Sequence, residues 1–274
     1  MSIKLIGLDL DRTTLNNEGK ISERTKQALE EAANKGVHVV VATGRSFHSM
    51  PEDVYHVNGL EYTANSNGAE IRELKTGETI YANYIAPEAV KAAYDYLKEK
   101  DFMIEVFTEG RAYIQSDEYE AIRSGANPFR ARDYVMKTRT PIDDIFKCML
   151  DWQDKIENIN IFFKTDEDKN ATYLDLINIP NATITSSMPD NLEIGGKTTS
   201  KATALMYLAD KFNIKKEEIM CCGDSPNDGE MLKLAGTAVA VANASDEIKE
   251  LANYHTDTND NDGVAKAIEN LVLK

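Results

Sequence analysis

Residues 3–15 of this chain read IKLIGLDLDRTTL, and this stretch decides the fold. Apolar residues occupy most positions from Ile3 to Leu10, and a short apolar run that ends in turn residues is typical of a strand buried on both faces. Asp9 and Asp11 stand at its carboxyl end, where open parallel α/β sheets bind their ligands. Two carboxylates about 4 Å apart repel by roughly 4 kcal/mol at an effective dielectric near 20, so we expect a bound cation, with Mg²⁺ as the natural candidate. The alternative is a pair of aspartates that only cap a turn.

Length and composition bound the class of protein. The chain has 274 residues, 42% hydrophobic and 28% charged, which is typical of a globular protein with one large core or two smaller ones. No apolar run approaches the ~18 residues of a membrane span, and the N-terminus does not resemble a signal peptide, so we expect a cytoplasmic protein. The net charge of −15 argues against nucleic acid and anionic membranes as partners. The three cysteines show no metal-ligand or redox spacing, so we expect free buried thiols.

The chain after the first stretch alternates between helix and strand. Ser22 can cap a helix through about residue 35, and the apolar run Val37–Ala42 predicts a second buried strand that ends in Thr43-Gly44-Arg45-Ser46. A strand, a helix and a strand within ~40 residues form a βαβ unit. Asn67-Gly68 lies between residues that could pair and indicates a hairpin. These segments predict a Rossmann-like parallel sheet with helices on both faces.

A second set of strands and helices occupies the middle of the chain. We interpret residues 83–189 as an inserted α/β cap, and residues 1–82 and 190–274 as one core, because the two outer parts share the parallel-sheet pattern. Six aromatic residues of the insert are expected to lie mostly in its own core: Phe102, Phe107, Tyr113, Phe129, Trp152 and Phe162.

Two more polar groups come from the C-terminal part. The buried strand Ile219–Cys222 ends in Gly223-Asp224-Ser225-Pro226-Asn227-Asp228, and Lys201 lies in the first turn of a predicted helix. A cation in that turn opposes the helix macrodipole by ~0.3–1 kcal/mol, so we expect an anionic partner for Lys201. Each group taken alone could be an ordinary turn or a solvated side chain. Their occurrence together with the strand-end aspartates and Thr43, at one edge of the inferred sheet, favours a site.

These motifs resemble those of the haloacid dehalogenase superfamily of phosphohydrolases. Within it they resemble the Cof-type branch, whose α/β cap (class IIB) lies between the second and third motifs. The four motifs are Asp9-Leu10-Asp11-Arg12-Thr13, Thr43-Gly44-Arg45, Ser200-Lys201-Ala202 and Gly223-Asp224-Ser225-Pro226-Asn227-Asp228. Asn67-Gly68-Ala69 and residues 259–264 (NDNDGV) are similar to further stretches of that branch. The resemblance covers the whole chain, and the last motif is the most specific.

The resemblance implies a Mg²⁺-dependent phosphatase for small phosphorylated metabolites, with sugar phosphates as the substrate class, acting through an aspartyl-phosphate. It implies that Asp9 is the nucleophile and that Asp11 serves as acid for the leaving alcohol and as base for water. Thr43 would donate to a phosphate oxygen, and Lys201 would neutralise charge on the phosphate and on Asp9. The further implied phosphate contacts are Leu10, Gly44, Arg45 and Asn227. The implied metal site consists of Asp9, the Asp11 carbonyl, Asp224 and waters, with Asn227 and Asp228 close to the metal or behind its direct ligands.

The first motif departs from the family pattern. Arg12 stands where a glycine is usual, and Thr14 replaces a usual leucine. If position 12 needs a left-handed backbone, a non-glycine residue costs ~1–2 kcal/mol, so the turn is either reshaped or strained. Arg12 could add positive charge at the mouth of the site or be an ordinary solvated arginine. Arg45 could contact the substrate or the cap, or it could pair with an acidic residue of the cap.

Two other functions stay open at this point. A phosphosugar mutase could use the same aspartyl-phosphate, and it would yield an isomerised product in place of free phosphate. A non-catalytic regulator that binds phosphate would be expected to have lost one of the carboxylates, and all of them are present.

Overall fold

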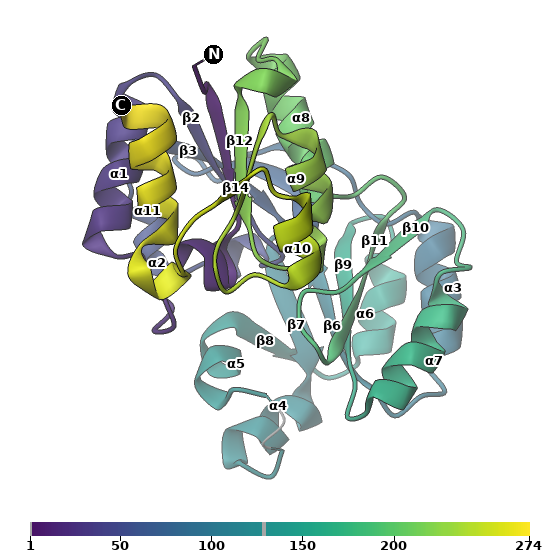
Figure 1. Ribbon diagram of the computed structural model, residues 1–274. Coiled ribbons are helices and arrows are strands. Elements are labelled where there is room, and N and C mark those ends of the chain that lie inside the picture. The colour runs from purple at the N-terminus through teal and green to yellow at the C-terminus, as the bar shows by residue number, and fades with distance from the viewer. Residues whose placement is uncertain (1, 128–129) are drawn as a thin grey trace. The chain divides into compact units, whose positions relative to one another are not determined.

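The computed structural model describes residues 2–127 and 130–274, which form two compact units (Figure 1). The first unit consists of Met1–Gly44, Pro51–Ala82 and Ser200–Lys274, and the second of Arg45–Met50 and Asn83–Thr199. Phe129, which we expected in the core of the insert, lies outside the described residues. No helix in the described ranges is both long and apolar enough to cross a membrane.

A mixed sheet forms the centre of the first unit. Its described strands follow the order β14-β13-β12-β1-β2-β3-β4-β5. The strands from β14 to β3 run parallel, and β4 and β5 continue the sheet antiparallel, with Asn67-Gly68 in the turn between β3 and β4. The bounds are β1 (Leu5–Leu8), β2 (His38–Ala42), β3 (Leu60–Asn65), β4 (Glu70–Glu73), β5 (Thr79–Ala82), β12 (Ile219–Gly223), β13 (Thr237–Ala240) and β14 (Tyr254–His255).

Helices cover both faces of this sheet. In Figure 1, α1 (Glu23–Asn34) and α11 (Gly263–Ile268) lie on one side of the strands, and α8 (Lys201–Lys211) and α9 (Gly229–Leu234) lie on the other. The remaining helices of this unit are α2 (Glu52–Tyr55) and α10 (Asp246–Leu251). Ser22 caps α1, since its Oγ accepts from the backbone N–H of Thr25 at 3.1 Å. β1 is buried throughout, and this layered arrangement confirms the predicted fold class.

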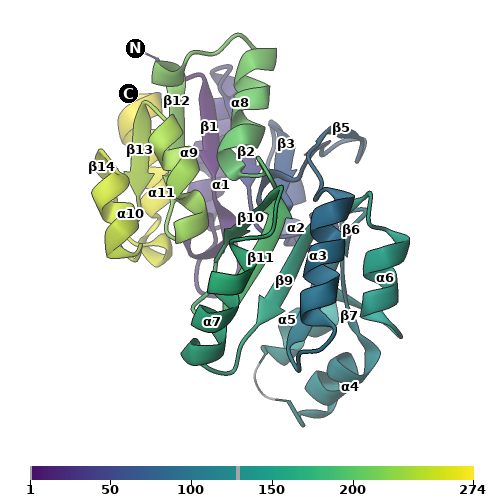
Figure 2. The same ribbon diagram turned by 90° about the vertical axis from the view of Figure 1, so that its right-hand side faces the viewer.

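The second unit has its own sheet, with described strands in the order β10-β11-β9-β6-β7-β8. Neighbouring strands are antiparallel except the pair β7–β8. The helices α3, α6 and α7 pack on the apolar face of the sheet (Figure 2). The bounds are α3 (Pro87–Leu97), β6 (Met103–Thr108), β7 (Arg111–Gln115), α4 (Ser116–Ser124), α5 (Arg132–Thr138), β8 (Arg139–Ile142), α6 (Ile145–Asp151), β9 (Ile156–Phe162), α7 (Asp166–Leu176), β10 (Ala182–Thr185) and β11 (Asn191–Gly196).

The border between the units differs from the predicted one. The prediction assigned residues from 190 onward to the core, but β11 pairs with β9, with Leu192 opposite Ile161. The second unit therefore extends to Thr199. It also includes the segment 45–50, where the backbone N–H of His48 donates to the Gly110 carbonyl at 2.8 Å.

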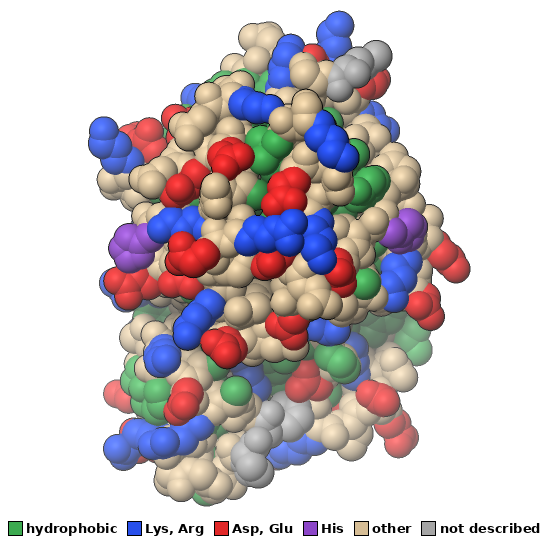
Figure 3. Space-filling view, turned by 60° about the vertical axis from the view of Figure 1, so that its left-hand side comes forward, with side chains coloured by type: hydrophobic (Ala, Val, Ile, Leu, Met, Phe, Trp, Pro, Cys, Tyr) green, Lys and Arg blue, Asp and Glu red, His purple; other side chains and the backbone are tan. Residues whose placement is uncertain are grey.

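The folded chain shows where the cysteines and the charged side chains lie. Cys148, Cys221 and Cys222 are buried and free, as predicted. On the face shown in Figure 3, lysine and arginine side chains are interspersed with aspartates and glutamates, and neither sign gathers into a broad patch there.

Candidate active site

The candidate site begins where neighbouring parallel strands end. β1 lies between β2 and β12, and Asp9, Thr43 and Asp224 directly follow these strands. The backbone N–H of Asp9 donates to the Cys222 carbonyl at 3.0 Å, so the end of β1 is fixed against β12. Residues far apart in the sequence thus meet at one edge of the sheet.

Lys201 reaches this edge from the first turn of α8. Its Nζ lies 2.7 Å from Asp9 Oδ1 and 2.7 Å from Asp228 Oδ1. The Lys201 side chain is only 1% exposed, and both carboxylates are buried with it. Gly68 lies against the start of α8, because a Cβ on it would lie 2.3 Å from the Ser200 carbonyl oxygen. The Asn67-Gly68 turn therefore helps to position Lys201.

Asp9, Asp224 and Asp228 form a buried cluster of carboxylates. Each offers an oxygen within 4.8 Å of the others, and the exposed Asp11 side chain is outside this group as far as the described residues go. Asp228 Oδ2 accepts from the backbone N–H groups of Asp224 and Ser225 at 2.9 and 3.0 Å. Because its other oxygen binds Lys201, Asp228 joins the lysine to the turn after β12.

The pKa values of these groups are shifted by burial and by one another. Burial raises the pKa of Asp9 well above its usual range; Asp228 and Asp224 add to the rise, and Lys201 opposes it. Burial also raises the pKa of Asp224 to about 6, reinforced by Asp228. Burial lowers the pKa of Lys201, but Asp228 and Asp9 raise it more, so it lies above the ordinary value and the ammonium stays charged. Among the described groups of the cluster, three carboxylates thus face one ammonium.

The cluster has the chemistry of a Mg²⁺ site. Magnesium is a hard cation that takes oxygen ligands and is bound through one or two carboxylates together with waters. Three buried carboxylates that share one buried ammonium, at the end of a parallel sheet, are an arrangement that a divalent cation would neutralise further. The residues present therefore fit this metal.

Thr43, Gly44 and Asn227 meet around Asn67. The Thr43 carbonyl accepts from the backbone N–H of Asn67 at 2.9 Å, and Asn227 Nδ2 donates to Asn67 Oδ1 at 3.0 Å. A Cβ on Gly44 would lie 3.2 Å from the same Asn67 oxygen. Thr43 and Leu10 are buried. Asn67, to which sequence reasoning assigned no role, therefore links two motifs, and its left-handed φ of 58° fits the Asn-Gly turn signal.

Arg45 belongs to the second unit, unlike Thr43 and Gly44 before it. Its Nη1 donates to the Ser49 carbonyl at 2.9 Å, and its guanidinium lies 4.9 Å from the centre of the Tyr134 ring. The contact with the cap, one of the alternatives left open by the sequence, is therefore present.

Arg12 and Thr13 follow Asp11 in the turn; the sequence left the role of Arg12 open and assigned none to Thr13. Thr13 Oγ1 donates to Asp224 Oδ1 at 3.2 Å. Arg12 has φ 61° and ψ 7°, so the turn does use a left-handed backbone at the position of the unusual arginine. Its Nε lies 3.7 Å from Asp224 Oδ2. Of the two interpretations left open for Arg12, the charge beside the site is therefore the one that the contact with Asp224 supports.

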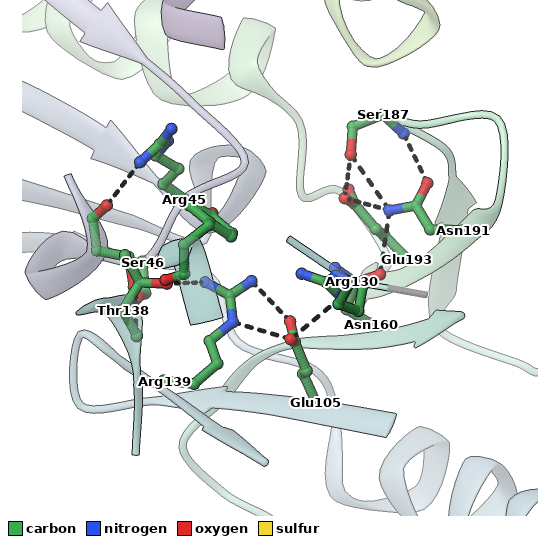
Figure 4. Close-up of polar contacts among 12 residues, drawn as sticks. Arg45, Ser46, Glu105, Arg130, Thr138, Arg139, Asn160, Ser187, Asn191 and Glu193 are labelled. Carbon is green, nitrogen blue, oxygen red and sulfur yellow. Dashed lines mark hydrogen bonds and ion pairs between the residues drawn. The ribbon is translucent and has the colours of Figure 1, made fainter. Parts of the chain in front are cut away.

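A second cluster of buried charges lies in the second unit (Figure 4). Arg139 binds Glu105 in a bidentate manner, with Nε and Nη2 donating at 2.9 and 2.7 Å. Arg130 Nη1 lies 3.2 Å from Glu105 Oε1. Burial raises the pKa of Glu105, but Arg139 and Arg130 together lower it below its ordinary value.

Polar side chains continue from this cluster across the sheet. Glu105, Asn160 and Glu193 lie opposite one another on β6, β9 and β11. Asn191 Nδ2 donates to Asn160 Oδ1 at 3.1 Å and to Glu193 Oε1 at 3.0 Å, and Ser187 Oγ donates to Glu193 Oε1 at 2.5 Å. Alternate residues of these strands face the apolar core of the unit. The sheet therefore carries a buried polar row on the face opposite its apolar core.

Comparison with known proteins agrees with the geometry. Residues 6–268 match the family of haloacid dehalogenase-like hydrolases. The 5-amino-6-(5-phospho-D-ribitylamino)uracil phosphatase YcsE of Bacillus subtilis (strain 168) is 31% identical over 100% of this chain and 97% of its own length. A haloacid dehalogenase-like hydrolase structure from B. subtilis has a TM-score of 0.85 and 29% identity, covering 98% of this chain and 100% of that one. The subclass IIB sugar phosphatase BT4131 has a TM-score of 0.80 and 25% identity, covering 97% and 98%.

The match over most of the chain shows that this protein belongs to the haloacid dehalogenase-like hydrolases. The resemblance to the Cof-type branch is thereby confirmed. The chain is a phosphatase that acts on phosphorylated substrates.

Proposed function

We propose that this enzyme hydrolyses small phosphate monoesters, with sugar phosphates as the substrate class, in a Mg²⁺-dependent reaction through an aspartyl-phosphate on Asp9. The observation that carries the proposal is the buried Asp9 held by Lys201 at 2.7 Å beside Asp224 and Asp228. Similarity to a sugar phosphatase supports the substrate class.

In the proposed reaction a carboxylate oxygen of Asp9 attacks phosphorus in line, and the bond from phosphorus to the leaving oxygen breaks. Asp11, which is exposed beside the buried cluster, protonates the leaving alcohol. It then takes a proton from the water that attacks the aspartyl-phosphate, which releases phosphate and restores Asp9. When bound, Mg²⁺ would supply positive charge that neutralises the phosphoryl oxygens and lowers the pKa of Asp9.

The other residues would hold the phosphoryl group and the metal. Lys201 would neutralise charge on both the phosphate and Asp9. Asp228 accepts from Lys201 and from two backbone N–H groups, so we assign it mainly to positioning the lysine. The proposed phosphate contacts are Leu10, Thr43, Gly44, Arg45, Lys201 and Asn227. The proposed metal ligands are Asp9, the Asp11 carbonyl and Asp224, with Asn227 and Asp228 next to the metal site.

We also propose that the second unit is the cap that selects the substrate. The part of its buried polar row beyond Glu105, formed by Asn160, Asn191 and Glu193, supports this role, because carboxylate and amide groups suit the hydroxyls of a sugar or polyol. A row made only to stabilise the sheet would be expected to hold apolar side chains.

The test is phosphate release from p-nitrophenyl phosphate and a panel of phosphorylated metabolites, with Mg²⁺ or EDTA. We expect turnover with Mg²⁺, loss with EDTA, and a decrease in kcat of at least about 10³-fold in Asp9→Asn. Asp246→Asn changes an aspartate that is 99% exposed and is expected to leave kcat unchanged. Full activity of Asp9→Asn would refute the nucleophile, and an isomerised sugar without free phosphate would favour a mutase.

A further inference from the structure

Arg12 lies in the turn after β1 and is held there by loops from the C-terminal part of the chain. The backbone of Arg12 is left-handed, and its carbonyl accepts from Asn243 Nδ2 at 2.8 Å. Asn243 Oδ1 in turn accepts from the backbone N–H of Asn259 at 3.0 Å. Arg12 Nη2 also reaches the Asn243 carbonyl at 3.5 Å. Loops that follow β13 and β14 therefore fix the position from which the Arg12 side chain extends.

From that position the guanidinium reaches Asp224. Arg12 Nε lies 3.7 Å from Asp224 Oδ2, while Asp224 Oδ1 accepts from Thr13. The Asp224 side chain is 3% exposed and that of Arg12 is 64% exposed, so the cation lies on the solvent side of a buried carboxylate. Burial and Asp228 raise the pKa of Asp224, and Arg12 opposes them.

We propose that Arg12 competes electrostatically with the metal at Asp224 and thereby lowers the affinity of the site for Mg²⁺. The inference rests on the proposed metal site. A guanidinium at this distance offsets part of the negative charge that the carboxylate offers to a divalent cation, and it repels that cation. Arg12 is thus a tuning residue, through which the enzyme would need more free Mg²⁺ for half-occupancy than the same site with an uncharged residue at position 12.

The charge and the backbone strain of Arg12 can be separated by substitution. Arg12→Met keeps a Cβ and most of the side-chain length but removes the charge, Arg12→Lys keeps the charge, and Arg12→Gly removes both the charge and the strain. Calorimetric titration of the full chain with Mg²⁺ gives the Kd, and thermal unfolding in EDTA gives the Tm of each variant.

The charge of the side chain at position 12 should determine the Kd for Mg²⁺. The presence or absence of a Cβ on the left-handed backbone of that residue should determine the Tm. Because the Arg12 side chain is largely exposed and its charge is screened by solvent, we expect a Mg²⁺ Kd about 2- to 5-fold lower in Arg12→Met and Arg12→Gly than in the wild type and in Arg12→Lys. We expect the Tm in EDTA to rise by about 2–4 °C in Arg12→Gly alone. The difference in Kd between the wild type and Arg12→Met should shrink in high salt.

Two results would overturn the inference in different ways. Equal Mg²⁺ Kd values for the wild type and Arg12→Met, or equal values for Arg12→Lys and Arg12→Met, would overturn the role of Arg12 alone and leave the metal site standing. A wild-type protein that binds no Mg²⁺ would overturn the metal part of the proposed function and this inference with it.

Discussion

The two buried ion clusters of this protein have opposite balances of charge. Among the described residues, the first unit gathers three buried carboxylates around one ammonium, whereas the second places two guanidinium groups on one buried carboxylate (Figure 4). Burial raises the carboxylate pKa in both places. The cations reverse the shift for Glu105 but not for Asp9 or Asp224. A buried carboxylate that is paired with enough cations stays ionised and has a structural role. A buried carboxylate with too few cations tends to bind a further cation or a proton.

We expect the largest change in stability when the buried carboxylate of the second unit is removed. Glu105→Gln leaves Arg130 and Arg139 buried without a carboxylate, so we expect the unit to lose about 3–5 kcal/mol of unfolding free energy. Trp152 is the chain's one tryptophan and lies in this unit, so urea unfolding followed by its fluorescence reports on the change.

Glu120→Gln is the matched control. It removes a carboxylate from an exposed pair with Arg123, and we expect a change below about 0.5 kcal/mol. Similar losses in the two variants would mean that the buried pairing of Glu105 contributes no more than a surface pair.

Replacing a buried carboxylate by an amide should instead increase the unfolding free energy in the first unit. Asp224→Asn removes a charge that the folded state holds poorly, since its pKa rises to about 6 from an ordinary value near 3.8. At neutral pH and without metal we expect a gain of about 1–3 kcal/mol, measured by thermal unfolding in EDTA. Added Mg²⁺ should stabilise the wild type and leave this variant unchanged. A loss comparable to that of Glu105→Gln would show that the cluster is not short of positive charge.

Much of the fold could be predicted because its signals are local. The apolar run of β1, the Ser22 cap and the Asn67-Gly68 turn each act within a few residues. The end of the insert could not be placed in this way. The alternation of apolar residues around Leu192 suits a strand in either sheet, and only pairing with β9 assigns it to the second unit.

For the site, the sequence predicted which strand ends would carry polar residues but not how they share their hydrogen bonds. Asp228 could be read as a metal ligand, although its contacts are with Lys201 and with backbone N–H groups. Whether Arg12 is strained or solvated depended on the path of the turn, which contacts with Asn243, far along the chain, help to fix. Contacts between residues so far apart in the sequence produce no periodic pattern from which they could be predicted.

The smallest effect that the comparison predicts is a pH dependence of stabilisation by Mg²⁺. Without metal, the raised pKa of Asp224 makes the folded state bind more protons than the unfolded state between about pH 4 and 6. This contribution to stability is present at low pH and is lost as the pH rises through about 6, where Asp224 becomes ionised and able to bind a cation.

At pH 5 the carboxylate would be mostly protonated, so the apparent Mg²⁺ affinity should fall about tenfold below its value at pH 7, equivalent to about 1.4 kcal/mol of stabilisation when the metal concentration is well above both Kd values. The measurement is the Tm shift caused by a fixed Mg²⁺ concentration at pH 5, 6 and 7, with Asp224→Asn as the control that should show no shift at any pH. An equal shift at pH 5 and pH 7 would mean that Asp224 is already ionised at pH 5, so that Lys201 and Arg12 together neutralise the cluster as fully as Arg130 and Arg139 neutralise Glu105.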